Sequence, residues 1–371
     1  MYICKRGKCT GCFACSNVCP VNAVFMNEDE RGHLIGEIDE SKCINCKLCF
    51  KTCPENNAIS LVRPKKAYAA WANEDRQRIT STSGGVASVL SQYIIDNNGV
   101  VYGSVFDKHK GVIHKRAETL EEIREFKGSK YTHSHINDNF KSVKKDLLNN
   151  RKVLFIGTPC QVSGLKNYLK HNYNNLYLVD IICHGVPSQK MLLEEISQYD
   201  PQHISFRDND DYKLRLFDEN GKILYEKSKE DSMYYLAFFY GCIFRDSCYV
   251  CKYATDKRVS DITIGDFWGL KSLMKNRIDY SKGISVILEN NEKGGEMLKC
   301  ISEKIIFEER PVQEAIDGNK QLQQPTCSSS EHEKFNNYYP NLDFKTSVKK
   351  AMRLRRLKLL IKKVIKFMKN I

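Results

Sequence analysis

The stretch Cys9-Thr10-Gly11-Cys12-Phe13-Ala14-Cys15-Ser16-Asn17-Val18-Cys19-Pro20 decides the fold of the N-terminal part of the chain. The same spacing of four cysteines and a proline returns at Cys43, Cys46, Cys49, Cys53 and Pro54, 34 residues later (43 minus 9). Nine of the 16 cysteines lie within the first 53 residues. The cysteines therefore form an internal repeat, which predicts a separate cysteine-rich domain over residues 1–63.

The C-x2-C-x2-C-x3-C-P spacing is typical of domains that hold two 4Fe–4S clusters. The first three cysteines of each repeat bind one cluster, and the fourth binds the other cluster. We expect one cluster on Cys9, Cys12, Cys15 and Cys53, and the other on Cys43, Cys46, Cys49 and Cys19. Two structural zinc sites are the alternative, but zinc sites favour ligand pairs separated by a longer loop.

Composition and length indicate a globular protein. The chain has 371 residues, of which 42% are hydrophobic and 28% charged, and this length predicts two or three domains. No apolar run reaches the roughly 18–20 residues that span a bilayer, and the N-terminus does not look like a signal peptide. We therefore expect a cytoplasmic protein, whose reduced cysteines serve metal binding or redox chemistry rather than disulfides.

The middle segment, residues 64–325, alternates strand-like and helix-like runs. We expect strands at 67–72, 100–106, 153–156 and 176–182, and helices at 86–96, 120–126, 137–148, 161–170 and 188–199. This alternation predicts a largely parallel sheet covered by helices, and a hairpin over 212–227 makes the segment mixed. No G-x-G-x-x-G follows a strand, so a Rossmann nicotinamide site has no support.

Four cysteines of the middle segment lie in three loops. Cys160 and Cys183 each follow a predicted strand, and Cys248 and Cys251 form a third loop. Open α/β sheets place ligands in loops of this kind. The four residues could hold a third cluster or a zinc ion, with Cys242 as a substitute, or they could be buried free thiols. Cys4, Cys300 and Cys327 have no partners by spacing, and we expect no role for them.

Six motifs of the middle segment, in this order, resemble those of the beta subunits of coenzyme F420-reducing hydrogenase and formate dehydrogenase. They occupy residues 82–86, 128–131, 157–161, 183–187, 247–252 and 261–269. The resemblance covers roughly residues 1–300. It implies FAD bound beside an iron–sulfur cluster, and it favours a third 4Fe–4S cluster on Cys160, Cys183, Cys248 and Cys251.

The resemblance also implies where the flavin is held. The expected contacts are Ser83, Gly84, Gly85, Ser129, Lys130, Tyr131 and Asp266. The first three open a predicted helix, where free N–H groups attract phosphate, although a serine cap after a glycine turn is the ordinary alternative. His184 is a candidate proton donor, or it holds the neighbouring cysteine loop in place.

The C-terminal segment, residues 349–371, carries ten Lys and Arg and no acidic residue. Without it the net charge of +13 falls to +3 (13 minus 10). Its apolar residues have helical spacing, which predicts a basic amphipathic helix that can lie on an anionic membrane, or else dock on the body. Nucleic acid is not an expected partner, because the body has no basic stripe. Residues 326–348 are polar, and we expect a linker there.

These features together predict an α+β protein with a ferredoxin-like two-cluster domain, a mixed α/β flavin-binding domain and a C-terminal amphipathic helix. We expect an iron–sulfur flavoprotein oxidoreductase that passes electrons from a ferredoxin or another low-potential donor through FAD to an organic substrate. The resemblance suggests surface polysaccharide biosynthesis as its context. The alternatives are a subunit that reduces or oxidises coenzyme F420, and a non-catalytic electron-transfer subunit of a larger redox complex.

Overall fold

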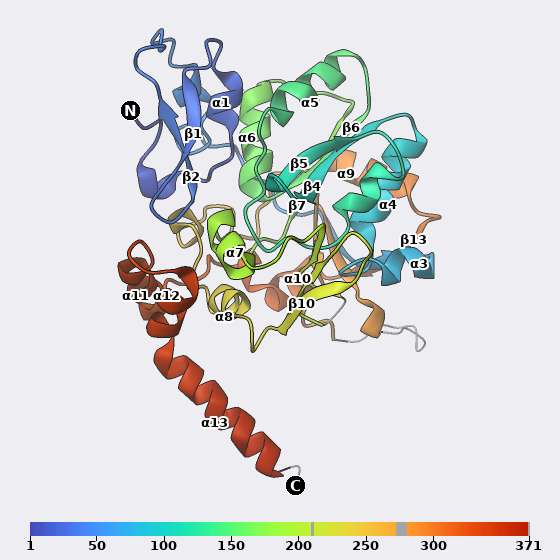
Figure 1. The fold of residues 1–371 in the computed structure, drawn as a ribbon. Helices are drawn as coiled ribbons and strands as arrows, with labels where there is room; N and C mark the ends of the chain where they lie inside the picture. The colour runs from blue at the N-terminus through green and yellow to red at the C-terminus, as the bar shows by residue number, and fades with distance from the viewer. Residues whose placement is uncertain (209–210, 272–279, 370–371) are drawn as a thin grey trace.

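Two short helices and a two-stranded sheet form the cysteine-rich N-terminal domain, blue in Figure 1. The computed structural model describes residues 1–208, 211–271 and 280–369. The elements of this domain are η1 (Arg6–Lys8), α1 (Ala14–Val18), β1 (Val24–Glu28), β2 (Leu34–Ile38) and α2 (Leu48–Thr52). Each α-helix begins after a left-handed residue, Phe13 at φ 65° or Lys47 at φ 60°. These residues occupy one position of the repeat, so the backbone repeats as well, and the expected ferredoxin-like domain is confirmed.

An eight-stranded sheet is the centre of the second domain, with the order β13-β3-β12-β11-β7-β6-β4-β5. Its strands are β3 (Lys66–Ala72), β4 (Val100–Asp107), β5 (Gly111–Ala117), β6 (Val153–Gly157), β7 (Leu176–Ile181), β11 (Ile262–Asp266), β12 (Ser285–Glu289) and β13 (Ile305–Arg310). The four central strands β11, β7, β6 and β4 are parallel, and the flanking pairs are antiparallel. The structure therefore confirms a mixed α/β domain.

Helices pack on both faces of this sheet. They are α3 (Asp75–Ile79), α4 (Val86–Asp96), α5 (Asn139–Leu148), α6 (Pro159–Leu169), α9 (Glu292–Cys300) and α10 (Val312–Gly318). Side chains alternate along β4, so that Tyr102 packs with α5 and α6 while Val101 packs with α4 and α9. The result is a three-layer arrangement of helix, sheet and helix.

One expected α-helix, residues 120–126, is a 3₁₀ helix instead, η2 (Glu122–Phe126). Nearby side chains bond to the backbone just before this helix and at its end. The Glu122 carboxylate accepts the N–H groups of Glu118 and Thr119, and the Lys130 ammonium donates to the carbonyls at the other end. These hydrogen bonds compete with those of a longer α-helix, and the segment stays a short 3₁₀ helix.

A further group of strands and helices covers one end of the large sheet. It contains β8 (His203–Ser205), β9 (Lys213–Phe217), β10 (Ile223–Ser228), α7 (Gln189–Ile196), α8 (Met233–Phe239), α11 (Ser330–Tyr338), α12 (Phe344–Ala351) and α13 (Arg353–Lys369). The three strands form an antiparallel sheet in the order β10-β9-β8, as the expected hairpin requires. The remaining short turns are η3 (Asp246–Cys248), η4 (Tyr280–Lys282) and η5 (Lys320–Leu322).

The segment 326–348 does not form the linker that we expected, because α11 and most of α12 lie within it. Phe335 and Phe344 are buried in one core with Tyr234 of α8. These apolar residues are widely spaced in a polar stretch, so they leave only a weak helical periodicity in the sequence. In Figure 1 both helices, in red, lie beside α7 and α8.

Gly84 packs against the backbone of the large sheet. Its N–H donates to Ser285 Oγ over 2.9 Å, and its carbonyl accepts from the Ala72 N–H over 2.6 Å. A Cβ atom at this position would overlap the Ala70 carbonyl oxygen and lie 2.9 Å from the Ser285 nitrogen. The loop between α3 and α4 can reach this position only with glycine.

We therefore expect Gly84→Ala to lower the melting temperature of the purified protein by roughly 1–4 °C, because overpacking against backbone costs about 1–3 kcal/mol and the unfolding entropy of a chain of this size is about 0.8 kcal/mol per degree. Gly7→Ala is the control, since a Cβ there would approach nothing closer than 3.9 Å. Differential scanning calorimetry checks both variants. Equal melting temperatures would show that the loop moves freely away from the sheet.

Candidate functional site

A cavity of ≈ 650 Å³ lies where three parallel strands of the large sheet end. Gly157 at the end of β6, Ile181 at the end of β7 and Asp266 at the end of β11 all line it. The carboxyl ends of parallel strands meet at one edge of a sheet, which is the usual ligand position in this class of fold. The volume lies within the range of about 300–1,000 Å³ that small-molecule sites have.

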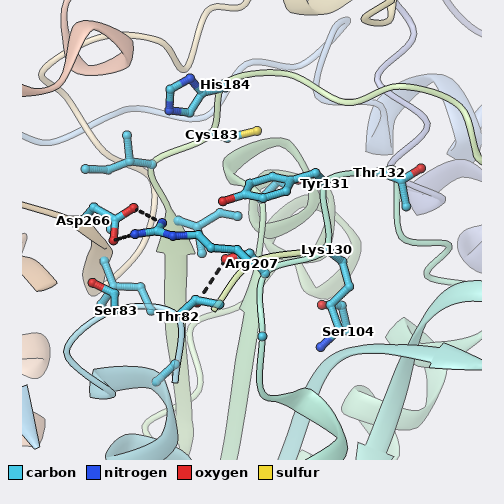
Figure 2. Close-up of a pocket in the computed structure, with 18 of the residues that line it drawn as sticks. Thr82, Ser83, Ser104, Lys130, Tyr131, Thr132, Cys183, His184, Arg207 and Asp266 are labelled. Atoms are coloured by element: carbon cyan, nitrogen blue, oxygen red, sulfur yellow. Dashed lines mark hydrogen bonds and ion pairs between the residues drawn. The ribbon is translucent and has the colours of Figure 1, made fainter. Parts of the chain in front are cut away.

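Most of the residues expected to contact a flavin line this one cavity. They are Ser83, Gly85, Ser129, Lys130, Tyr131 and Asp266, together with His184. Gly84 does not line it, because this residue faces β3 and β12. Gly85 adopts φ 85° immediately before α4, so the first turn of this helix borders the cavity. Thr82 Oγ1 and Ser129 Oγ are 3.1 Å apart and join the two loops (Figure 2).

Lys130 uses its ammonium group within the protein. The Nζ atom donates to the carbonyls of Glu125, Phe126 and Lys127 over 3.3, 3.0 and 2.8 Å. An ammonium has three N–H donors, so these bonds account for all of them. Burial lowers the pKa of Lys130 to about 7. The side chain thus holds the loop at the cavity wall, and its stem faces the cavity.

Asp266 forms an ion pair that no sequence pattern indicates. Its carboxylate accepts from Arg207 Nη1 over 2.6 Å and from Nη2 over 3.3 Å (Figure 2). The Arg207 guanidinium lies 4.7 Å from the ring centre of Tyr212. Arg207 and Asp266 are 59 residues apart in the chain, so no short-range sequence pattern links them. The pair places a fixed, bidentate group beside Tyr131 in the cavity wall.

Tyr131 and His184 both line the cavity. Burial raises the pKa of Tyr131 and lowers the pKa of His184, so both side chains are neutral near pH 7. The His184 carbonyl accepts from Thr326 Oγ1 over 2.8 Å. The neutral His184 imidazole would take up a second proton near pH 7 only if a nearby negative charge raised its pKa.

The four cysteines of the middle segment lie together. Cys160 follows β6 at the start of α6, Cys183 follows β7, and Cys248 and Cys251 lie in and just after η3. Burial raises the pKa of Cys183, and the charges of Cys248, Cys160 and Cys251 raise it further. Cys183 also lines the cavity. The set is therefore next to the candidate flavin site.

Cys242, the substitute in our prediction, lies elsewhere. Its thiol is fully buried in the core beside α11 and donates to the Glu331 carbonyl over 3.4 Å. Cys300 and Cys327 are exposed. None of these three thiols interacts with the set that contains Cys183 in the part of the chain that the structure describes.

The first N-terminal set also comes together as the spacing predicts. Burial raises the pKa of Cys15, and the charges of Cys12, Cys9 and Cys53 raise it further. Cys4, for which we expected no role, lies against this set, and its hydrogen bond lowers the pKa of Cys9 to about 6. All five thiols line one small cavity.

The second N-terminal set lies nearer the surface. The charges of Cys19 and Cys46 contribute to the raised pKa of Cys49, after burial. Cys43 accepts the Asn45 N–H over 3.4 Å, and Cys46 is exposed. Among the described residues, no three His, Cys, Asp or Glu side chains are arranged to hold a single metal ion. A cubane cluster has a different requirement, because four cysteines share four irons.

Comparison with known proteins supports both the cysteine-rich N-terminal domain and the second domain. Residues 8–57 match the family described as 4Fe-4S dicluster domain. Residues 150–315 match the family described as coenzyme F420 hydrogenase/dehydrogenase, C terminus of the beta subunit. The two matches cover separate parts of the chain, in the order in which the sequence predicts the two domains. The predicted resemblance is thereby confirmed at the level of these domains, and the dicluster domain accounts for two 4Fe–4S clusters.

Two known proteins are similar over most of the chain. A coenzyme F420-dependent sulfite reductase from Methanocaldococcus jannaschii is 25% identical over 317 residues, which are 81% of this chain and 47% of that protein. This chain thus spans about half the length of that relative. A chain of the F420-reducing [NiFe] hydrogenase complex from Methanosarcina barkeri has a TM-score of 0.46 and 17% identity, over 75% of this chain and 95% of that chain.

The cysteine-rich N-terminal domain and the second domain meet at a buried arginine. Arg245 Nη1 donates to the carbonyls of Cys9 and Leu34 over 3.2 and 2.8 Å. The charge of this guanidinium favours the thiolates of Cys9, Cys160 and Cys248. Its Nε and Nη2 atoms have no hydrogen-bond partner among the described residues. Buried donors beside converging thiolates fit an anionic iron–sulfur cluster on each side.

We expect Cys248→Ser to lower the iron content of anaerobically purified protein from about 12 to about 8 atoms per chain, because each cubane holds four irons. Cys242→Ser is the matched control: it removes a buried thiol outside the set and keeps a donor for the Glu331 carbonyl. Iron analysis together with the electron paramagnetic resonance of the reduced protein checks both. A Cys248→Ser protein with the full iron content would contradict a third cluster at this position.

Proposed function

We propose that this chain is an iron–sulfur flavoprotein oxidoreductase, in which electrons pass from the dicluster domain through a third cluster to FAD and then to an organic substrate. One observation supports this most directly. Cys183 belongs to the third cysteine set and also lines the cavity that contains most of the expected flavin contacts. A cluster on this set and a flavin in this cavity would be neighbours.

The electron path begins at the surface of the dicluster domain. Cys46, in the second set, is exposed, so a ferredoxin or another low-potential donor can approach there. The first set follows, and the charge of Cys160 acts on the buried Cys12 thiol of that set. The cysteines therefore form a continuous sequence of sites from the surface to the cavity.

The cavity residues fit a flavin dinucleotide in size and chemistry. FAD, when bound, accepts electrons one at a time and delivers two together. The first turn of α4 offers N–H groups to a phosphate, and Ser83 and Ser129 add hydroxyl groups. The Arg207–Asp266 pair and Tyr131 also line the cavity, where they can position a ring and exclude water.

Two other functions are possible for the same site. The named relative depends on coenzyme F420, so this deazaflavin is a second candidate substrate, with a larger redox complex as partner. A non-catalytic electron-transfer subunit would not need a cavity of ≈ 650 Å³ at the sheet edge. An acceptor in surface polysaccharide biosynthesis stays a prediction that rests on the resemblance alone.

The flavin content of protein purified without oxygen tests the proposal. We expect stoichiometric FAD, which reduced ferredoxin converts to its reduced form. Protein that binds no flavin, even after incubation with FAD, would favour the non-catalytic subunit. Oxidation of the reduced protein by coenzyme F420 would favour the second candidate.

A matched pair of variants tests the position of the flavin. We expect Ser129→Asp to weaken FAD binding at least about tenfold, because a carboxylate in the cavity wall repels the pyrophosphate. Ser129→Asn has nearly the same size without the charge, and we expect less than about a threefold change. Fluorescence titration of the deflavinated proteins measures both affinities. Equal effects of the two substitutions would place the pyrophosphate away from Ser129.

A further inference from the structure

Helix α13 exposes an apolar stripe along its length. Figure 1 shows the helix extending away from the rest of the protein. Six apolar side chains, each 42–69% exposed, form the stripe: Leu354, Leu357, Ile361, Val364, Ile365 and Met368. At 100° per residue they fall within an arc of about 100°. A stripe of this kind on a helix normally packs against a partner.

The body of the protein contacts α13 on the opposite side. Arg355 Nη2 forms an ion pair with Glu331 Oε1 over 2.7 Å, and its guanidinium lies 4.2 Å from the ring centre of Tyr240. Leu359, four residues further, lines the cavity. Residues 355 and 359 share one helix face, which is away from the stripe. These contacts hold the helix with its apolar stripe directed outward.

The charge of the segment selects the kind of partner. Ten Lys and Arg without an acidic residue would repel a second copy of the same helix. The same charges favour an anionic lipid surface by about 1 kcal/mol per cation. None of the described helices is both long and apolar enough to cross a bilayer. Helix α13 therefore has the features of a helix that lies in the interface of an anionic membrane.

The rim of the cavity lies next to this helix. Phe239, Tyr240 and Trp268 line the cavity and are still 39–43% exposed. With Leu359 they form an apolar mouth. Aromatic side chains are favoured at the level of lipid headgroups. Because Arg355 and Leu359 face the body while the stripe faces away from it, a membrane that receives the stripe lies about one helix diameter, roughly 10 Å, from this mouth.

We propose that α13 docks on an anionic membrane surface and thereby holds the cavity mouth about one helix diameter from the headgroup layer, so that the substrate of the cavity is an amphiphile held in the bilayer. The docking and the orientation of the mouth follow from α13 and the rim alone. The substrate class rests in addition on the proposed function of the cavity.

Flotation of the full-length holoprotein with lipid vesicles tests the docking. We expect binding to phosphatidylcholine vesicles that contain about a quarter phosphatidylglycerol, and at least about tenfold weaker binding to pure phosphatidylcholine. The variant Leu357→Gln/Ile361→Gln/Val364→Gln should reduce binding at least about tenfold without changing the charge. The control is Ile223→Gln on β10, which is also exposed and lies outside α13. Equal binding of the triple variant and the control overturns the docking, as does a helix-dependent dimer that ignores vesicles.

Tryptophan quenching tests the orientation of the mouth. The chain has two tryptophans, Trp71, which is 5% exposed, and Trp268, which is 40% exposed at the rim. We expect a lipid with a nitroxide on its headgroup to quench the bound protein, and Trp268→Phe to remove this quenching. Bound protein without quenching overturns the orientation and the substrate class. Both measurements proceed without turnover, so a protein that binds no flavin refutes the proposed function while the docking result stands.

Discussion

The relative positions of the cysteine sets depend on one contact, in which a face of helix α6 packs on the N-terminal domain. Gly164 packs so closely on the dicluster domain that a Cβ atom there would lie 3.0 Å from the Cys12 sulfur. Cys160 is four residues earlier and thus on the same helix face. A single helical turn therefore connects the first N-terminal cysteine set to the set beside the cavity. A bulkier residue at position 164 would separate the two domains between these two cysteine sets.

The buried guanidinium of Arg245 adds an electrostatic requirement to this packing. A buried charge without a counter-charge costs several kcal/mol, on the order of 3–5 when its partner is removed. Two of its nitrogen atoms have no partner among the described residues, and His33 and His133 nearby are buried and neutral. Anionic clusters on the neighbouring cysteines would supply that counter-charge. Assembly of the clusters and stability of the domain interface are then expected to be coupled.

Local spacing predicted the parts of the site that are encoded within a few residues. The two N-terminal sets follow from the repeat, and Cys160 and Cys183 follow from strands whose ends share an edge of the sheet. Contacts between distant residues were beyond this reasoning. The Arg207–Asp266 pair, the position of Cys4 against Cys9 and Cys53, and the buried Phe335 of α11 depend on tertiary packing, which leaves no periodic pattern.

The positions of the proposed sites keep the entry of single electrons apart from the entry of the organic substrate. In Figure 1 the dicluster domain lies at the top left and α13 extends to the bottom, with α11 and α12 between them. A soluble one-electron donor would approach the exposed Cys46, while the apolar mouth beside Leu359 would lie near the membrane that α13 binds. A donor protein on the membrane side would compete with the bilayer for the same surface. Placing the two entrances apart allows both partners to be bound at once, as a site that collects single electrons and delivers pairs requires.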